Sequence, residues 1–398
     1  MLPPSTLQRV RALLTRRSWL QRAYLLAALV SAYLLLVVRN RTTHKRIIAG
    51  DSPLNNHIAQ GMKATLARYM PTWWANGHVQ IFLTFLVRQA RIKYKRDVLV
   101  LEDGGHASLD WALESSAPDA ATRTQKLPDD APIVVILHGL TGCSDNMRSL
   151  CAEAFKHGYR PVVFNKRGHG GVKLMTPRLQ GFGCVKDLTE AIVEIEKAYP
   201  RSKLYGIGLS AGSGLLTSYL GETGGKSRLE AGVMISPGYN TYDLFCLGRI
   251  HRLYDVLMTF ALKKLLLEHK RELQDVIDVF KALRVTSVRE FDEHVYMKLN
   301  GYADLESYWV DNNPSRAYDN VQRPTLCINA LDDPVCTKEN IAYNLFEDHP
   351  RAMLIETEAG SHCGFFEGDI PRKSWSNEVA MRYLDLVREY QSQRQQQQ

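Results

Sequence analysis

The chain has 398 residues, which is enough for one large α/β domain with additional segments. Its formal net charge is +8, but nine of its 50 Lys and Arg residues lie in residues 1–46, where there is no acidic residue. The remaining 41 basic residues stand against 42 acidic ones, so the body of the chain is neutral and nucleic-acid binding is excluded as its main function. The seven cysteines are scattered without a C-x-x-C pair, which indicates neither a zinc site nor a disulfide framework.

An apolar stretch over residues 19–38 follows a basic N-terminal segment, 1–18, and its last sixteen residues carry no charge. A helix of this length covers about 30 Å, the thickness of the bilayer's hydrocarbon core. We predict an uncleaved transmembrane anchor here. A cleaved signal peptide is the alternative, but no small-x-small cleavage site precedes Arg39. Basic residues flank the stretch on both sides, so charge alone does not set its orientation.

After a juxtamembrane extension, 39–93, in which a short helix is predicted from Leu66 to Met70, the pattern becomes that of alternating strands and helices. Apolar runs bounded by turn residues indicate strands, and amphipathic stretches between them indicate helices. We assign residues 94–240 to the first part of an α/β core. Its predicted strands are 94–114 (a hairpin turning at 103–105), 133–137, 160–164, 203–208 and 231–235, and its helices are 146–157 and 184–198.

Residues 241–312 interrupt this rhythm with helical amphipathicity, and we predict a helical lid over the core. Ordinary helical packing without any gating role is the alternative. The strand and helix pattern resumes in 313–391, with strands at 325–329 and 352–356 and a helix at 374–391. The Gln-rich residues 392–398 are predicted to be a disordered tail.

The sequence Gly208-Leu-Ser210-Ala-Gly212 fits G-x-S-x-G, the turn that exposes a nucleophilic serine in the α/β-hydrolase fold. Two other motifs overlap or follow it. Residues 206–211 fit a variant dinucleotide fingerprint, but they lie far from the start of the core and lack the acidic residue that this motif requires. Residues 221–227 resemble a phosphate-binding loop that is one residue short. The predicted fold is therefore an α/β-hydrolase, a mostly parallel sheet with helices on both faces.

A serine needs a positioned base, and that base needs a third group to fix its tautomer. In this fold the acid and then the histidine follow the serine along the chain, each in a loop after a strand. His362, in a loop flanked by Gly360 and Gly364, satisfies this order. Asp332 and Asp333 compete for the acid, and we choose Asp333, with Asp332 expected to be solvated or to cap a helix.

The oxyanion formed during ester cleavage requires two N–H donors. One is expected from Ala211, directly after the nucleophile, and the other from the loop that follows strand 133–137, where Leu140 is our choice. His138, in the same loop, and His169 are expected to be structural. This chemistry needs neither a metal nor an organic cofactor.

Motifs over nearly the whole chain from Met70 onward resemble those of the membrane-anchored α/β-hydrolase-domain (ABHD) lipases, the branch that includes bacterial YheT-like esterases. They include Gly77-His-Val-Gln80, Gly139-Leu-Thr-Gly142, Leu174-Met-Thr-Pro-Arg178, Ser287-Val-Arg-Glu-Phe-Asp292, Asn329-Ala-Leu-Asp-Asp333 and Gly364-Phe-Phe-Glu-Gly368. Two departures are Ser361, where the family has a second glycine before the histidine, and Trp309, where it tends to have a tyrosine.

The resemblance implies a single-pass type II protein of the endoplasmic reticulum or plasma membrane that hydrolyses lipid esters. Phospholipids are the substrates of some members, and monoacylglycerol or short acyl esters those of others. The expected partners are the lipid substrate and the bilayer, and no obligatory protein partner is evident. Two alternatives stay open: an acyltransferase that uses the same triad, and a catalytically silent binding or scaffold protein.

Overall fold

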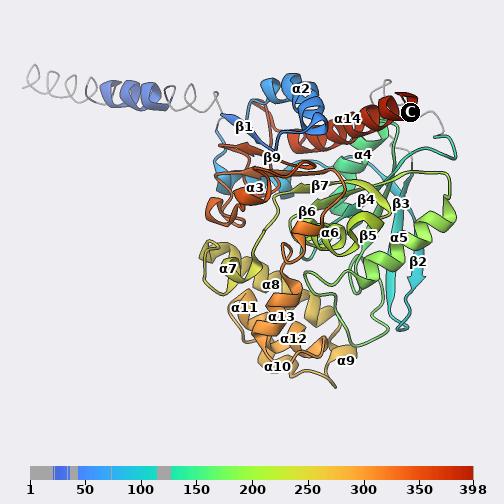
Figure 1. Cartoon of the computed structure of the whole chain (residues 1–398). Helices are drawn as coiled ribbons and strands as arrows, with labels where there is room; N and C mark the ends of the chain where they lie inside the picture. Colours follow the sequence, from blue (N-terminus) through green and yellow to red (C-terminus); the bar gives the residue numbers. More distant parts are fainter. Residues whose placement is uncertain are drawn as a thin grey trace, which may run out of the picture.

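The structure, a computed structural model, describes residues 21, 23–33, 35, 44–72, 74–113 and 127–397. Within these ranges a nine-stranded sheet runs through the body in the order β1-β9-β8-β7-β6-β4-β5-β3-β2 (Figure 1). The strands are β1 (Lys45–Ile48), β2 (Lys93–Val100), β3 (His106–Leu113), β4 (Ile133–Leu137), β5 (Arg160–Asn165), β6 (Leu204–Leu209), β7 (Leu229–Ile235), β8 (Thr325–Ala330) and β9 (Ala352–Thr357).

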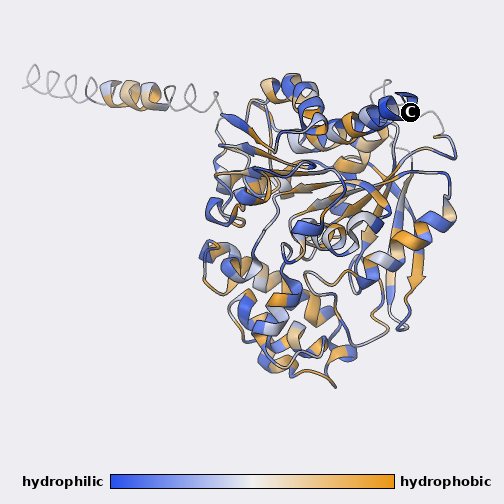
Figure 2. Ribbon diagram, viewed as in Figure 1, coloured by the Kyte–Doolittle hydropathy of each residue, from blue (hydrophilic) through white to orange (hydrophobic). Residues whose placement is uncertain are grey.

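The six strands β4 to β9 run parallel, and antiparallel strands close both edges: β1 on β9, and the β2–β3 hairpin on β5. The parallel strands consist almost entirely of buried residues and read as near-continuous apolar runs, as Figure 2 shows for the middle of the sheet. Strands covered on both faces require such runs, because neither face meets water. All parallel strands point their carboxyl ends to one edge, where ligands bind in open α/β sheets.

Helices cover both faces of the sheet. One hydrophobic cluster packs α2 (Pro53–Arg68), α4 (Arg148–Lys156) and α14 (Trp375–Gln397) on one face, and a second packs α5 (Lys186–Ala198) and α6 (Ala211–Thr223) on the other (Figure 1). Neighbouring strand residues alternate between the two clusters: Val134 and Ile136 face the first, Ile133 and Val135 the second. This three-layer arrangement is the predicted α/β-hydrolase architecture.

The segment between β7 and β8 is helical and has a core of its own. Its helices gather on one side of the body, away from α2 and α14 (Figure 1). They are α7 (Thr241–Phe245), α8 (Arg252–Glu268), α9 (Lys270–Leu273), α10 (Val279–Ala282), α11 (Val288–Phe291), a π-helical turn (Asp292–Tyr296), α12 (Met297–Leu299) and α13 (Leu305–Asn312). We refer to residues 241–312 as the helical insertion.

Residues assigned to the juxtamembrane extension belong to the body instead. β1 pairs with β9, and α2 packs against α14. The predicted short helix 66–70 is wrong in extent: α2 begins at Pro53, after the Ser52 cap, and ends at Arg68 because the chain turns extended before Pro71. A further short helix, α3 (Gly77–Leu86), follows.

The C-terminal residues differ from the predicted disordered tail, and many N-terminal residues lie outside the part of the chain that the structure describes. Residues 392–397, predicted to be a disordered tail, continue α14 as exposed helix, since glutamine is a good helix former and extending a helix needs no new nucleus. The predicted segment 1–18 and part of the predicted anchor 19–38 lie outside the described residues. Of the anchor, residues 23–33 are helical and exposed. Among all the described residues no helix is long and apolar enough to cross a bilayer.

The π-helical turn of the insertion buries a carboxyl group without a partner. Asp292 is 0% exposed, and neither of its oxygens accepts a hydrogen bond from the residues that the structure describes. Burial, with a further contribution from the charge of Asp255, raises the pKa of Asp292 well above its ordinary value. Folding therefore favours the neutral form of this carboxyl group.

We expect the stability of the protein to depend on the charge of Asp292. Because the folded state holds this proton more tightly than the unfolded chain, the contribution is fully present below the ordinary aspartate pKa and is lost as pH rises through the folded pKa. The free energy of unfolding of the wild type, measured against Asp292→Asn by denaturant titration from pH 4 upward, should fall by up to about 1.4 kcal/mol per pH unit. A difference between the two proteins that does not change with pH would contradict this.

Candidate active site

Ser210 lies on a strained turn between β6 and α6. Its backbone angles, φ 53° and ψ −120°, fall in a region that side chains rarely adopt. The two flanking glycines are required by contact: a Cβ on Gly208 would lie 2.4 Å from the carbonyl oxygen of Gly212, and one on Gly212 would lie 2.2 Å from that of Leu137. The turn thus presses the start of α6 against the ends of the central strands and leaves the serine side chain at the carboxyl edge of the sheet.

His362 comes to Ser210 from the loop that follows β9. Its Nε2 lies 2.7 Å from the Ser210 hydroxyl oxygen, and its Nδ1 lies 2.9 Å from Oδ2 of Asp333. A carboxylate can only accept, so Nδ1 carries the proton and Nε2 is left to accept a hydrogen bond from the serine. The three predicted triad residues are therefore brought together in hydrogen-bonding contact, from positions 152 and 29 residues apart along the chain.

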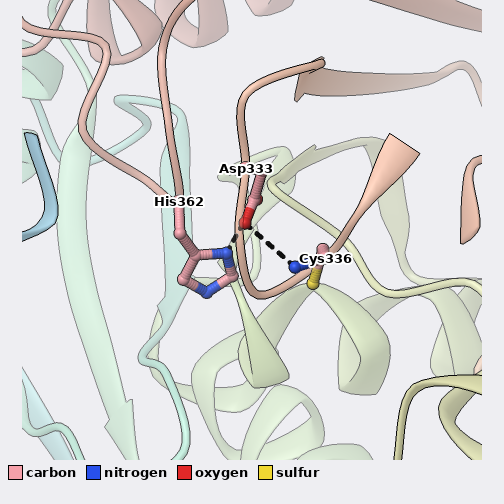
Figure 3. Close-up of side chains that lie close together, drawn as sticks. All are labelled: Asp333, Cys336 and His362. Carbon is pink, nitrogen blue, oxygen red and sulfur yellow. Dashed lines mark hydrogen bonds and ion pairs between the residues drawn. The ribbon is translucent and has the colours of Figure 1, made fainter. Parts of the chain in front are cut away.

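Asp333 is held in the turn after β8 by the backbone. Its other oxygen, Oδ1, accepts the N–H groups of Val335 and Cys336 at 2.8 and 2.9 Å. Figure 3 shows the carboxyl group lying between the His362 ring and the Cys336 backbone nitrogen. These bonds fix the direction of the carboxylate toward the imidazole, and the side chain is fully buried.

Asp332 has a different position from the solvated or helix-capping one that we expected. Its Oδ1 accepts the N–H groups of Gly360 and Ser361, at 2.9 and 2.7 Å, in the loop that carries His362. Burial raises the pKa of Asp332 to about 6. The two adjacent aspartates thus contact the histidine differently: Asp333 bonds its ring, and Asp332 bonds its loop.

Asp333, Cys336 and His362 also lie close enough together to hold a metal ion. The hydrogen bonds argue against that use, because both oxygens of Asp333 already accept bonds. A metal would also need the Cys336 thiolate, and burial raises the pKa of this thiol well above its ordinary value. The cluster is better explained as an acid and a base in contact.

The two predicted oxyanion donors line one small cavity beside Ser210. Leu140 and Ala211 both border it, and among the hydrogen bonds of the described residues none uses the N–H of either. A Cβ on the neighbouring Gly139 would lie 3.7 Å from the Ser210 Cβ, so this loop passes directly beside the nucleophile. The rest of the cavity wall is formed by Lys166, Gln180, Gly181, Phe182, Leu215 and Tyr296.

Three residues near the site were not singled out from the sequence for a role there. Ser236, buried after β7, accepts the Cys363 N–H at 2.9 Å and so supports the histidine loop. Ser361 has a φ of 58°, the left-handed region that favours the glycine of the family, and its hydroxyl donates to the Gly77 carbonyl. Lys166 directly follows β5 at the carboxyl edge of the sheet. This position after a predicted strand is the one sequence signal that could have indicated a role for Lys166 in the site.

Trp309 packs behind the wall of this cavity. The indole is buried in the insertion and stacks on Phe182 and Phe245, with ring centroids 5.8 Å apart in both pairs. Since Phe182 borders the cavity, the Trp309 indole packs directly behind that wall.

A serine on a strained strand–turn–helix, beside a histidine and an aspartate that follow later parallel strands, defines an α/β-hydrolase. Comparisons with known proteins agree, since residues 132–369 match the family model for the alpha/beta hydrolase fold. Protein ABHD15 of Homo sapiens is 32% identical over 324 residues, covering 80% of this chain and 68% of its own. Phospholipase ABHD3 of Mus musculus is 28% identical over 375 residues (90% and 88%), and monoacylglycerol lipase ABHD2 of Bos taurus is 25% identical over 394 (90% and 91%). The chain belongs to the ABHD lipase family of α/β-hydrolases and is a carboxylic ester hydrolase.

The different contacts of Asp332 and Asp333 predict different effects of removing their charge. Asp333→Asn puts an amide where the imidazole needs an acceptor, so kcat should fall by about a thousandfold or more. Asp332→Asn keeps an oxygen for the two loop N–H groups and should lower kcat by less than about tenfold. Ester turnover of both purified variants at pH 8 checks this. A larger loss for the Asp332 variant would contradict the assignment.

Proposed function

We propose that the protein is a serine hydrolase that cleaves carboxylic esters of membrane lipids, with Ser210 as nucleophile, His362 as general base and Asp333 as the group that orients it. The observation that carries the proposal is the pair of hydrogen bonds from serine to imidazole to carboxylate, 2.7 and 2.9 Å long. Each bond lies within the range for a working base.

In the acylation step, the Ser210 oxygen attacks the ester carbonyl while Nε2 of His362 takes its proton. The Asp333 carboxylate holds Nδ1–H and stabilises the imidazolium that forms. The carbonyl oxygen becomes an anion, which the N–H groups of Leu140 and Ala211 would receive. The Ala211 N–H is the first of α6, so the positive end of the helix dipole also faces that charge.

The tetrahedral intermediate then expels the alcohol part of the lipid, to which His362 returns the proton. The acyl group stays on Ser210 until a water, deprotonated by the same imidazole, attacks the new ester. Loss of Ser210 as leaving group releases the free acid, and His362 reprotonates the serine. This sequence consumes one ester and one water, and it returns every group to its initial state.

A lipid substrate is supported by the names of the relatives and by the walls of the cavity. ABHD3 is a phospholipase and ABHD2 a monoacylglycerol lipase. Beside the oxyanion donors the cavity has the apolar side chains of Phe182 and Leu215 and the ring of Tyr296, the last contributed by the insertion. The cavity has room for only about one water molecule, so an acyl chain could enter here only if the insertion moved, and we therefore propose that the insertion acts as a lid.

Membrane association is part of the same proposal. Exposed apolar side chains gather in the helical residues 23–33 and in α3, where Phe85 is 79% and Leu86 is 77% exposed. Large apolar surfaces of this kind mark contact sites for proteins or lipids. A single-pass anchor over 19–38 stays our prediction.

We expect Ser210→Ala and His362→Ala each to lower kcat for a lipid ester by at least about a thousandfold, because either change removes the activated nucleophile. Hydrolysis of phosphatidylcholine and monoacylglycerol, followed by mass spectrometry of the released fatty acid, measures this. Retention of activity in the serine variant would contradict the proposed mechanism.

The same assay separates the two alternatives. With glycerol added as an acceptor, a hydrolase releases mainly free acid, whereas an acyltransferase forms a new ester. A serine-reactive fluorophosphonate that fails to label the wild-type protein would instead favour a silent binding protein.

A prediction for the anchor uses the chain with and without residues 1–43. The full chain should stay in the membrane pellet after a carbonate wash, because a buried apolar helix is not released by high pH. The shortened chain should be washed off, since α3 can contact the bilayer only at its surface. Release of both chains would contradict the anchor.

A further inference from the structure

Lys166 is a buried amine whose side-chain partners both belong to the loop that is proposed to hold the oxyanion. The residue is only 8% exposed, and no ion pair recorded in the described ranges involves it. Its Nζ lies 3.3 Å from the carbonyl oxygen of Gly139 and 3.3 Å from that of Leu140. A buried ammonium without an acid is costly, and burial lowers the pKa of Lys166 to about 7. Such a residue requires an explanation beyond packing.

The carbonyl that Lys166 bonds determines the direction of an oxyanion donor. Gly139 C=O and Leu140 N–H belong to the same planar trans peptide and point in opposite directions. A donor that fixes the Gly139 oxygen therefore fixes the Leu140 N–H as well. Lys166 also borders the same small cavity as Leu140 and Ala211.

Two histidines support the same peptides. Nδ1 of His138 lies 2.8 Å from the Gly139 oxygen, and its Nε2 accepts the Lys166 backbone N–H, so Nδ1 is the donor. Nε2 of His169 lies 3.1 Å from the Leu140 oxygen and its Nδ1 lies 2.8 Å from the Arg167 oxygen, and a neutral ring can donate to only one of these two carbonyls. Burial lowers the pKa of both rings well below the ordinary value, which keeps them neutral beside the ammonium. Among these groups Lys166 is the only one that contacts both carbonyls.

We propose that Lys166 is a positioning residue for the oxyanion hole: the N–H groups of its side chain hold the Gly139 and Leu140 carbonyls so that the Leu140 N–H stays directed at the oxygen of the tetrahedral intermediate. The proposal rests on the proposed function and assigns to that site a residue outside the triad. Lys166 acts through the loop and does not touch the reacting atoms. Its loss must therefore weaken binding of the oxyanion more than binding of the uncharged substrate.

Lys166→Met tests this, because methionine keeps an unbranched apolar chain and removes all the donors. Loss of one oxyanion donor costs roughly a hundredfold to a thousandfold in kcat. Loss of its positioning should cost about tenfold to a hundredfold, with KM changed less than about threefold. Affinity for a trifluoromethyl ketone, which forms an oxyanion on Ser210, should fall by the same factor as kcat/KM. Affinity for an ether analogue, which has no carbonyl, should stay within about threefold.

The matched control is Lys173→Met, in the same loop after β5 but exposed, which should leave all these quantities unchanged. If Lys166→Met does not reach the wild-type circular dichroism spectrum, Lys166→Ala, which also removes every side-chain donor, takes its place under the same criterion. A kcat within threefold of wild type, or equal losses for the ketone and the ether analogue, would overturn the proposal. Failure of the proposed function looks different: the wild type itself would show no turnover that depends on Ser210.

Discussion

The site depends on one steric constraint, the close approach of the α6 N-terminus to the ends of β4 and β6. With no Cβ at Gly208 and Gly212, the backbone can turn within three residues and hold Ser210 in a conformation that it would not otherwise adopt. The close approach of α6 to these strand ends sets the position of the Ser210 oxygen and the direction of the Ala211 N–H. It also sets the distance between Ser210 and the loop that contains Gly139. The surrounding strands are buried on both faces and leave the turn no room to relax.

A second connection runs from the oxyanion loop to the insertion. Lys166 bonds the loop carbonyls and His169 lies against that of Leu140, and His269, at the end of α8, bonds the carbonyl of Gly168 at 2.7 Å. One short turn after β5 thus contacts both the catalytic edge and the insertion.

Much of the fold and of the candidate site could be predicted because the signals are local. The strands of the core are continuous apolar runs. The G-x-S-x-G motif predicts the strand–turn–helix geometry, because the close backbone approach at this turn requires glycine on both sides of the serine. His362 is marked by its neighbours and by its place after the last strand. The pairing of β1 with β9 joins residues more than 300 positions apart, and nothing in the residues near β1 indicates it.

The parts that were missed depend on tertiary contact. Asp332 was expected to be solvated or to cap a helix, and only the path of the turn after β8 brings it to the N–H groups of the histidine loop. Lys166 acts on a loop 27 residues earlier in the chain, a contact that no local pattern encodes. Burial of Asp292 likewise follows from how the insertion packs.

The proposed triad and oxyanion hole are tested most directly by the crystal structure of the protein after reaction with a fluorophosphonate. We expect phosphorus bonded to the Ser210 oxygen, and a phosphonyl oxygen within about 3 Å of both the Leu140 and Ala211 nitrogens. An adduct on another residue, or one whose phosphonyl oxygen faces away from both nitrogens, would contradict it.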